Sequence, residues 1–430
     1  MDPIQCLLDL ERLGIKFGLQ NIAALAGALG NPQDAFRSVI IAGTNGKGSV
    51  AAMVERGLRA AGLATGLYTS PHLVRLEERF VLSGLPVGTE VLREHAASVV
   101  EAARTLRASG ALQSDPTFFE ATTAAAFSLF RAARVDVAVL EVGLGGRFDA
   151  TNIAEPFAGA ITTIAFDHEA LLGHTLAEIA FEKAGVVKPG MTVVTGELPD
   201  EAMAVVLAAG SERGARIVLS SEATRAHVSI EDGRTVLDLE TPCRRYGALR
   251  LALRGKHQAA NAIVATRLLE ELSGCGIEVP GTAVVEALTS TVWRGRLELV
   301  DLVGRTVLVD SAHNPAGAEV LADYLRATHP EGLPLVFGAM RDKDISRMLS
   351  ILLPSATHVV VAAPRTSRAA DPAHIAAEAR KEKTSVLVAG CVREALDLAW
   401  GFAPDIAVAG SIFLAGEALA AVDEMRGGGS

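Results

Sequence analysis

The sequence predicts an α/β protein with two domains, each built around an open and mainly parallel sheet. Its 430 residues exceed one ordinary domain, and 50% of them are hydrophobic, which is enough for a large core. Apolar strands alternate with helices through residues 1–290, and the alternation restarts after Trp293-Arg294-Gly295. We therefore expect one domain over residues 1–292 and a second, smaller one over residues 296–430.

Strands of the first domain are expected where short runs are apolar throughout, as in strands that helices cover on both faces. These runs are 38–42, 64–68, 135–142, 160–165 and 192–195. Apolar residues at helical spacing predict a helix over 50–61, which Gly62 would end. Thr175 and Glu178 have the spacing of a capping box and would open a helix that runs to about Ala184.

The pattern changes over residues 228–253, where alternation predicts antiparallel strands with a hairpin turn at Glu231-Asp232-Gly233. A helix over 258–272 is expected to close this part of the chain. In the second domain, 297–300 and 307–310 predict a hairpin. Strands are then expected at 335–337, 358–362, 385–388 and 406–409, with helices between them, which is typical of an open α/β sheet.

Composition argues against several classes of protein. The chain has 40 Lys and Arg against 50 Asp and Glu, and a net charge of -10 does not favour binding to nucleic acid or to an anionic membrane. The four cysteines form no CxxC pair, the apolar runs are too short to span a membrane, and the first ten residues lack the basic region of a signal peptide. We therefore expect a soluble cytoplasmic protein.

The segment Ala42-Gly43-Thr44-Asn45-Gly46-Lys47-Gly48-Ser49 lies between a predicted strand and a predicted helix. Glycines let backbone N–H groups surround phosphate oxygens, while the helix N-terminus and Lys47 add positive charge. Gly48 separates Lys47 from Ser49, so the strict Walker A spacing fails by one residue. A glycine-rich turn that binds nothing is the alternative, but strand, helix, lysine and hydroxyl together favour a phosphate loop.

Polar side chains follow several other strands, at the edge where open sheets bind ligands. The strand before Glu141 resembles a Walker B strand, whose acid holds Mg²⁺; a solvated strand end is the alternative. His168 follows another strand and could bind metal or be structural. Ser70 precedes Pro71 and could complete a magnesium shell or belong to an ordinary loop. Lys183 ends the capped helix, where a cation also suits the helix dipole.

The second domain carries Val309-Asp310-Ser311-Ala312-His313-Asn314-Pro315. Asn314 is a natural N-cap and Pro315 a natural first helical residue, so a helix is expected to begin there. Asp310 and His313 would then lie at a strand-to-helix turn. Capping alone would explain the segment, but an acid and a histidine together also favour a ligand site.

Taken together, these motifs resemble the folylpolyglutamate synthase/dihydrofolate synthase family, related to the Mur ligases of peptidoglycan synthesis. The matching segments appear in the family's order: 42–49, 68–73, 140–152, 167–168 with 172–173, 182–185, 257–261 and 310–315. The resemblance covers nearly the whole chain. It implies an N-terminal P-loop ATPase domain, a C-terminal Rossmann-like domain that contacts glutamate and nucleotide, and an active site between them. It also implies a role in folate biosynthesis and one-carbon metabolism.

The resemblance further implies roles for individual residues. ATP would be bound by Thr44, Asn45, Gly46, Lys47, Gly48 and Ser49, with further nucleotide contacts from Asn261, Arg296 and Asp310. Catalysis would involve Lys47, Glu141 and His313, of which His313 matches a position near the γ-phosphate. Ser70 and Glu141 would hold one Mg²⁺, and Glu141, His168 and a carbamylated Lys183 a second site, with a monovalent cation as a further candidate cofactor. Thr117, Phe118, Phe119, Glu120, Phe148 and Asp149 match positions lining the pterin site. Phe148 departs from the family's usual Leu, and Phe118-Phe119 could equally be core packing.

The implied reaction joins L-glutamate to a folate or to dihydropteroate at the expense of ATP. A carboxylate is a poor electrophile, so the γ-phosphoryl group is first transferred to it, and the glutamate amine then displaces phosphate. Domain closure would protect the acyl phosphate from water. We expect a monomer. The alternatives are a Mur ligase that acts on a UDP-muramoyl peptide and a P-loop protein without ligase chemistry, although the sequence lacks the N-K-x-D motif of GTPases.

Overall fold

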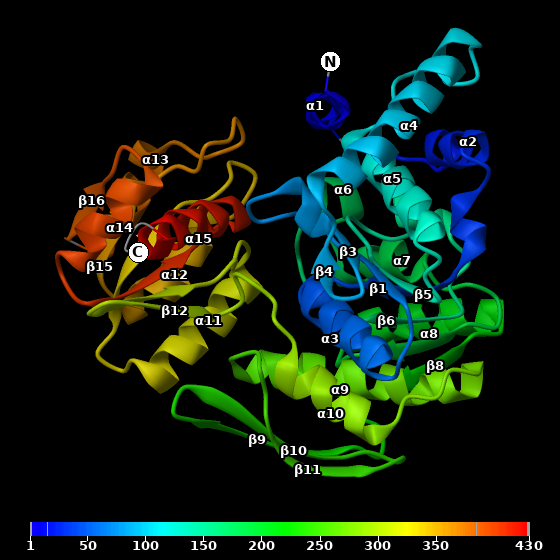
Figure 1. Cartoon of the computed structure of the whole chain (residues 1–430). Helices are drawn as coiled ribbons and strands as arrows, with labels where there is room; N and C mark the ends of the chain where they lie inside the picture. The colour runs from blue at the N-terminus through cyan, green and yellow to red at the C-terminus, as the bar shows by residue number, and fades with distance from the viewer. Residues whose placement is uncertain (1, 15, 384, 428–430) are drawn as a thin grey trace.

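The computed structural model describes residues 2–14, 16–383 and 385–427. Two large sheets lie side by side, the first built from residues before 220 and the second from residues after 297 (Figure 1). A small antiparallel sheet lies below the first one. The α/β class with two parallel-type sheets is therefore confirmed. Within the described residues, no helix has both the length and the apolar character needed to cross a bilayer.

The first sheet has eight strands in the order β4-β3-β2-β5-β1-β6-β7-β8, and β3 is antiparallel to both of its neighbours. The bounds are β1 (Arg37–Ala42), β2 (Thr65–Tyr68), β3 (Phe80–Leu82), β4 (Leu85–Pro86), β5 (Val137–Glu141), β6 (Ala158–Ile161), β7 (Thr192–Thr195) and β8 (Arg216–Leu219). Because β1 lies between β5 and β6, the carboxyl ends of three parallel strands meet at the middle of the sheet.

Helices cover both faces of this sheet because alternate strand residues point to opposite sides: Ile40 packs into one core cluster, and Val39 and Ile41 pack into the other. One face carries α1 (Pro3–Leu8), α2 (Gln20–Ala28), α4 (Thr89–Ala108), α5 (Phe118–Ala132), α7 (Leu176–Ala184) and α8 (Asp200–Arg213). The other carries α3 (Lys47–Ala60), α9 (Lys256–Glu271) and α10 (Gly281–Ser290). A short helix, α6 (Glu169–Leu172), precedes α7.

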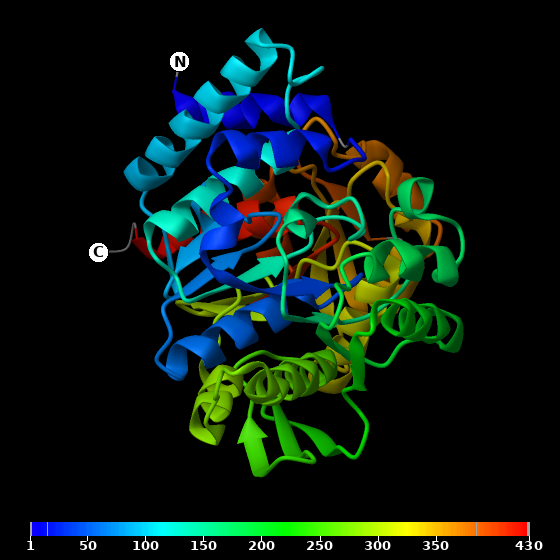
Figure 2. The ribbon, with the colours of Figure 1, turned by 90° about the vertical axis from the view of Figure 1, so that its right-hand side faces the viewer.

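The small sheet contains β9 (Arg225–Glu231), β10 (Arg234–Glu240) and β11 (Arg245–Arg250). Leu237, Leu239 and Leu251 pack on the cluster that holds α9 and α10, so these two helices lie between the small sheet and the large one (Figure 2). Short 3₁₀ helices complete this part at Asp9–Leu13, Pro32–Ala35, Leu76–Arg79, Ala150–Ile153 and Leu272–Cys275.

The second sheet has six strands in the order β12-β13-β17-β14-β15-β16, and only β12 is antiparallel to its neighbour. The bounds are β12 (Glu298–Leu302), β13 (Arg305–Val309), β14 (Leu333–Phe337), β15 (Ala356–Val361), β16 (Val386–Val388) and β17 (Asp405–Ala409). One face is covered by α11 (Pro315–Thr328), α12 (Ile345–Leu352), the 3₁₀ helix Leu353–Ser355 and α13 (Pro372–Ala379). The other is covered by α14 (Val392–Trp400) and α15 (Ile412–Gly427).

Most predicted elements are confirmed, including the capping box at Thr175 and the hairpin at residues 231–233. The prediction of a strand over 160–165 is wrong at its end, because β6 stops at Ile161. The apolar run continues, but Thr162 and Thr163 turn their hydroxyls toward Asn45 of the glycine-rich loop. After Ile161, hydrogen bonds to the glycine-rich loop take the place of regular strand pairing. The spacing of apolar residues alone does not reveal these bonds.

Candidate active site

A cleft of about 410 Å³ lies at the carboxyl ends of β1, β5 and β6 and is closed on its far side by loops of the second sheet. It gathers fourteen of the twenty residues that the sequence analysis singled out: Thr44, Asn45, Gly46, Lys47, Gly48, Ser49, Ser70, Glu141, His168, Lys183, Asn261, Arg296, Asp310 and His313. These residues are spread over 270 positions of the chain (from 44 to 313, by their numbers). Their convergence in one cavity makes this cleft the candidate active site.

The glycine-rich loop connects β1 to α3 and bends sharply at two glycines. Gly43 has φ +141° and Gly46 has φ +85°, so both adopt backbone conformations that other residues avoid. A Cβ at position 46 would also overlap the Asn261 side chain, which belongs to α9. The loop is held from beneath, since Asn45 N–H donates to Thr163 Oγ1 (3.0 Å) and Ala165 N–H donates to Thr44 Oγ1 (3.1 Å). This preformed turn at a helix N-terminus is the geometry that binds phosphate.

Gly48, the residue that interrupts the Walker A spacing, has a packing reason to be glycine. It lies in the first turn of α3, where a Cβ would come within 2.9 Å of the Trp293 indole ring. Trp293 comes from the segment that leads to the second sheet. The insertion therefore lets this segment pack directly on the helix that follows the loop.

We predict that Gly48→Ala destabilises the protein, although alanine favours a helix by about 1 kcal/mol over glycine. The new methyl group must displace the Trp293 ring, and such overpacking costs about 1–3 kcal/mol. Urea unfolding followed by tryptophan fluorescence measures the change. Gly27→Ala is the matched control, because Gly27 is an exposed helical glycine where a Cβ would make only an ordinary 4.0 Å contact with Asn31 Oδ1, and it should stabilise the protein or leave it unchanged.

Two lysines, the partly buried Lys47 and the buried Lys183, share one acceptor at the base of the loop. Lys47 Nζ donates to the carbonyl oxygens of Gly43 (3.2 Å) and Thr44 (3.0 Å), and Lys183 Nζ donates to the same Gly43 oxygen (2.9 Å). Burial first, and the nearby charge of Lys47 second, lower the pKa of Lys183 to about 7. About half of Lys183 is therefore an uncharged amine near neutral pH, whereas a helix-dipole role would need a cation.

Glu141 ends β5 and is buried at the floor of the cleft. Its Oε2 accepts a hydrogen bond from Ser70 N–H (3.0 Å), which joins the ends of β5 and β2. Burial raises the pKa of this carboxyl, and the positive charge of Lys47 partly opposes that shift. Glu141 and Ser70 both line the cleft, and their side chains carry the hard oxygen ligands that suit Mg²⁺.

Further contacts anchor the walls of the cleft. Asp310, at the end of β13, accepts from the N–H groups of Leu297 (2.9 Å) and Ala312 (2.8 Å), which fixes the turn before α11. Asn261 donates to Gln258 Oε1 (3.0 Å), and Gln258 in turn donates to Ser49 Oγ (3.2 Å). As predicted, Asn314 caps α11 by accepting from Gly317 N–H and Pro315 is its first residue.

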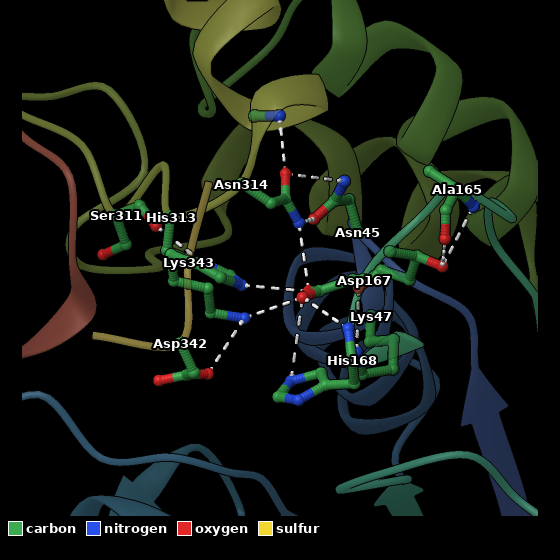
Figure 3. A network of polar contacts seen from close by, with 12 residues as sticks. Asn45, Lys47, Ala165, Asp167, His168, Ser311, His313, Asn314, Asp342 and Lys343 are labelled. Atoms are coloured by element: carbon green, nitrogen blue, oxygen red, sulfur yellow. Dashed lines mark hydrogen bonds and ion pairs between the residues drawn. The ribbon is translucent and has the colours of Figure 1, made fainter. Parts of the chain in front are cut away.

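Asp167 lies at the centre of the cleft network and was not among the site residues predicted from the sequence (Figure 3). Its carboxylate accepts from Lys343 Nζ (2.7 Å) and Asn314 Nδ2 (3.2 Å), and it lies 3.7 Å from His313 Nε2. Although burial alone would raise the pKa of Asp167, the His313 and Lys343 contacts hold it well below its usual range. Lys343 follows β14 at the carboxyl edge of the second sheet, a position that could have singled it out.

The six residues predicted to line a pterin site do not line this cleft. Thr117 and Glu120 bond each other's backbone N–H as the capping box of α5, and Asp149 accepts from the N–H groups of Gly143 and Leu144 (both 2.9 Å). Three aromatic rings complete the set. Phe118 lies under the Arg79 guanidinium, Phe119 lies beside Tyr68 and over Gly143, and Phe148 is exposed against Phe17. A pterin contact at these six positions stays a prediction.

His257, at the cleft end of α9, supplies a stability prediction. Burial lowers its pKa to about 4, below the ordinary 6.5, and its Nδ1 has no hydrogen-bond partner among the described residues. Between these two values the unfolded chain binds more protons than the folded one, so the unfolding free energy falls as pH falls from 6.5. This group contributes up to about 3 kcal/mol of that loss.

We therefore expect His257→Gln to flatten the fall in stability between pH 7 and pH 5, as measured by urea midpoints at several pH values. His174→Gln is the control, since the His174 side chain is 79% exposed and should leave the slope unchanged. An unaltered slope in His257→Gln would contradict an imidazole that partial burial keeps uncharged.

The residues expected to bind metal all line the cleft and carry suitable donor atoms. Within the described ranges, no three His, Cys, Asp or Glu side chains cluster as a ready metal site. The proposed set therefore depends on other oxygen donors: the Ser70 hydroxyl and the carbamate that Lys183 would form. Glu141 presents a buried carboxylate, and burial lowers the pKa of His168 to about 4, so its imidazole is uncharged and can act as a ligand.

Comparison with known proteins agrees with this geometry. The Mur ligase middle domain model matches residues 41–269, and the Mur ligase glutamate ligase domain model matches residues 295–411. The dihydrofolate synthase/folylpolyglutamate synthase of Mycobacterium tuberculosis is 36% identical over 96% of this chain and 90% of its own length. The chain belongs to the folylpolyglutamate synthase/dihydrofolate synthase family. This membership confirms the resemblance seen in the sequence.

Members of this family also share the fold. The structure of Mycobacterium tuberculosis folylpolyglutamate synthase complexed with ADP superposes with a TM-score of 0.90 at 33% identity, covering 98% of this chain and 99% of that one. A Halobacterium salinarum family member, named as a probable bifunctional folylpolyglutamate synthase/dihydropteroate synthase, is 38% identical over 96% of this chain. The chain spans about half the length of that relative, 50%.

Proposed function

We propose that this protein is an ATP-dependent ligase that adds L-glutamate to a folate, and to dihydropteroate, through an acyl phosphate. One observation carries the proposal: the glycine-rich loop, two lysines and a buried carboxylate share a single cleft with His313 and Asp310 of the second sheet. This is the set of groups that phosphoryl transfer to an acid requires. The family membership supports the substrate class, since its named members act on folates.

In the proposed reaction, backbone N–H groups of residues 43–47 hold the ATP phosphates. The Lys47 ammonium group stabilises the negative charge on the phosphoryl group as it is transferred. For this, Lys47 leaves the carbonyl oxygens that it now contacts, a hydrogen-bond exchange within its own loop. His313 and Arg296 line the same cleft and would contact the transferred phosphoryl group. The substrate carboxylate attacks phosphorus and ADP departs. The uncharged glutamate amine then attacks the acyl carbon, phosphate leaves, and the nitrogen gives up one proton to solvent as the amide forms.

Magnesium would be held by Ser70 and Glu141, and at a second site by Glu141, His168 and a carbamylated Lys183. When bound there, Mg²⁺ supplies positive charge beside the β- and γ-phosphates. The lowered pKa of Lys183 supports carbamylation, because only the uncharged amine reacts with carbon dioxide. Intact-mass measurement of the native protein should show the added mass of one carbon dioxide, which Lys183→Met should lack.

The organisation of the chain follows from this proposal. We assign phosphate and folate binding to residues 1–292 and the ligase domain that closes over them to residues 296–430. The active cleft is then complete within one chain, which fits a monomer in the cytoplasm, and the net charge of -10 does not favour nucleic acid as a partner.

Product mass spectrometry tests the proposal. The protein is incubated with ATP, Mg²⁺ and glutamate, with dihydropteroate, tetrahydrofolate or a UDP-muramoyl substrate offered separately. We expect a glutamylated product and ADP from one or both pterin acids. Ligation only to the UDP-muramoyl substrate, or phosphate release that ignores all acids and glutamate, would overturn the proposal.

A further inference from the structure

The two halves of the cleft are joined by a buried polar network centred on Asp167. Asp167 comes from the segment between β6 and α6, whereas Lys343 and Asn314 belong to the second sheet's loops. The side chains of Asp167 and Lys343 are 10% and 8% exposed, so this ion pair is nearly removed from water. Buried pairs of this kind add little net stability, which makes fold stability a poor reason for it.

The same segment is fastened to the phosphate loop. Thr162 Oγ1 donates to the Asn45 carbonyl (2.6 Å), and Asn45 N–H donates to Thr163 Oγ1 (3.0 Å). Asn45 in turn meets the second half directly, since Asn314 Nδ2 donates both to Asn45 Oδ1 (3.1 Å) and to Asp167 (3.2 Å). Any movement between the halves therefore changes the hydrogen bonds of the loop that would hold the triphosphate.

The charges of the network favour the state in which the two halves are together. With the halves apart, the Asp167 carboxylate would stand beside the phosphate loop without a cation from the second sheet, and it would repel a bound triphosphate. With the halves together, Lys343 and His313 face that carboxylate (Figure 3). His313 is held from behind, because its Nδ1 lies 2.9 Å from the Ser311 carbonyl oxygen. Closure thus removes the repulsion and turns two side chains toward the cleft.

We propose that Asp167 is a positioning residue that locks the closed cleft and holds Lys343 and His313 over the phosphate loop. This inference rests on the proposed function for its catalytic readout, but its structural readout is independent. Asp167 acts through its neighbours and forms no bond with the reacting atoms.

A double-mutant cycle tests the proposal with Asp167→Asn, Lys343→Met and the double variant. We expect Asp167→Asn to lower kcat about tenfold or more with KM for ATP changed less than about threefold, because closure follows nucleotide binding. The double variant should be no worse than the poorer single variant. Asp342→Asn is the matched control. Asp342 lies on the same segment as Lys343 and 4.0 Å from it, but its side chain is half-exposed, so kcat should be unchanged.

Hydrogen exchange of the full-length protein supplies the structural readout. Asp167→Asn should speed exchange in residues 310–314 and 340–343, while the core strand β1 stays protected. Asp167→Glu, which keeps the charge, should recover part of both effects and serves if Asp167→Asn unfolds. Multiplicative losses in the cycle, or unchanged exchange in both segments, would overturn the proposal. A wild-type protein that ligates no acid would overturn the proposed function, and the exchange result would still decide the role of Asp167.

Discussion

Replacing Lys47 by methionine is expected to lower kcat/KM for ligation about a thousandfold, the largest effect of any single change. Lys47 is the only cation that the glycine-rich loop itself contributes, and methionine keeps its length without its charge. The Lys47 charge stabilises the transition state more than it stabilises bound ATP. Its loss should therefore lower kcat more than it lowers the affinity for ATP. Steady-state kinetics with saturating ATP measure the change.

Lys188→Met is the matched control for this prediction. Lys188 belongs to the same half of the molecule and donates to the Asn152 carbonyl oxygen (2.9 Å), but it lies outside the cleft. Its replacement should leave kcat within about twofold, because surface-proximal contacts of this kind contribute little. Equal losses in both variants would indicate that lysine burial, and not the phosphate loop, explains the result.

Replacing Glu141 by glutamine is expected to reduce kcat about a hundredfold or more, because the change removes one charge at the floor of the cleft without altering its shape. The amide can still accept from Ser70 N–H, so the contact between β5 and β2 should survive. Raising the Mg²⁺ concentration should restore part of the activity. Kinetics over a magnesium series, with thermal unfolding as a check on folding, measure both effects.

The control for Glu141 lies on the same strand. Asp136 immediately precedes β5 and accepts from Ala64 N–H (2.8 Å), at the opposite end from the cleft. Asp136→Asn should therefore leave catalysis and its magnesium dependence unchanged. If Asp136→Asn lowered kcat as strongly as Glu141→Gln, the special role of the cleft carboxylate would be wrong.

The sequence predicted those parts of the molecule that depend on local pattern. The strands before the phosphate loop and before Glu141 are apolar because both faces are covered, and the caps at Thr175 and Asn314 follow from residues a few positions away. Motif order placed fourteen residues that the structure brings into one cleft. Local pattern does not determine strand order, and nothing in it places β5 between β2 and β1.

Contacts between distant segments explain what was missed. Asp167 stood out in the sequence only as the neighbour of His168, since its partners Asn314 and Lys343 lie 147 and 176 positions away. The strand expected over 160–165 ended early for the same reason, because Thr162 and Thr163 bond a loop 117 or more positions earlier. Gly48 interrupts the Walker A spacing at a position where the Trp293 ring leaves no room for a Cβ, and only the folded chain reveals this contact.

Isotope transfer tests the central claim most directly. The acid substrate is labelled with ¹⁸O in its reacting carboxylate and incubated with the protein, ATP, Mg²⁺ and glutamate, and the released phosphate is analysed by mass spectrometry. An acyl phosphate requires one carboxylate oxygen to leave with phosphorus, so we predict one ¹⁸O atom in each phosphate formed during ligation. Ligation with unlabelled phosphate would contradict phosphoryl transfer to the acid in this cleft.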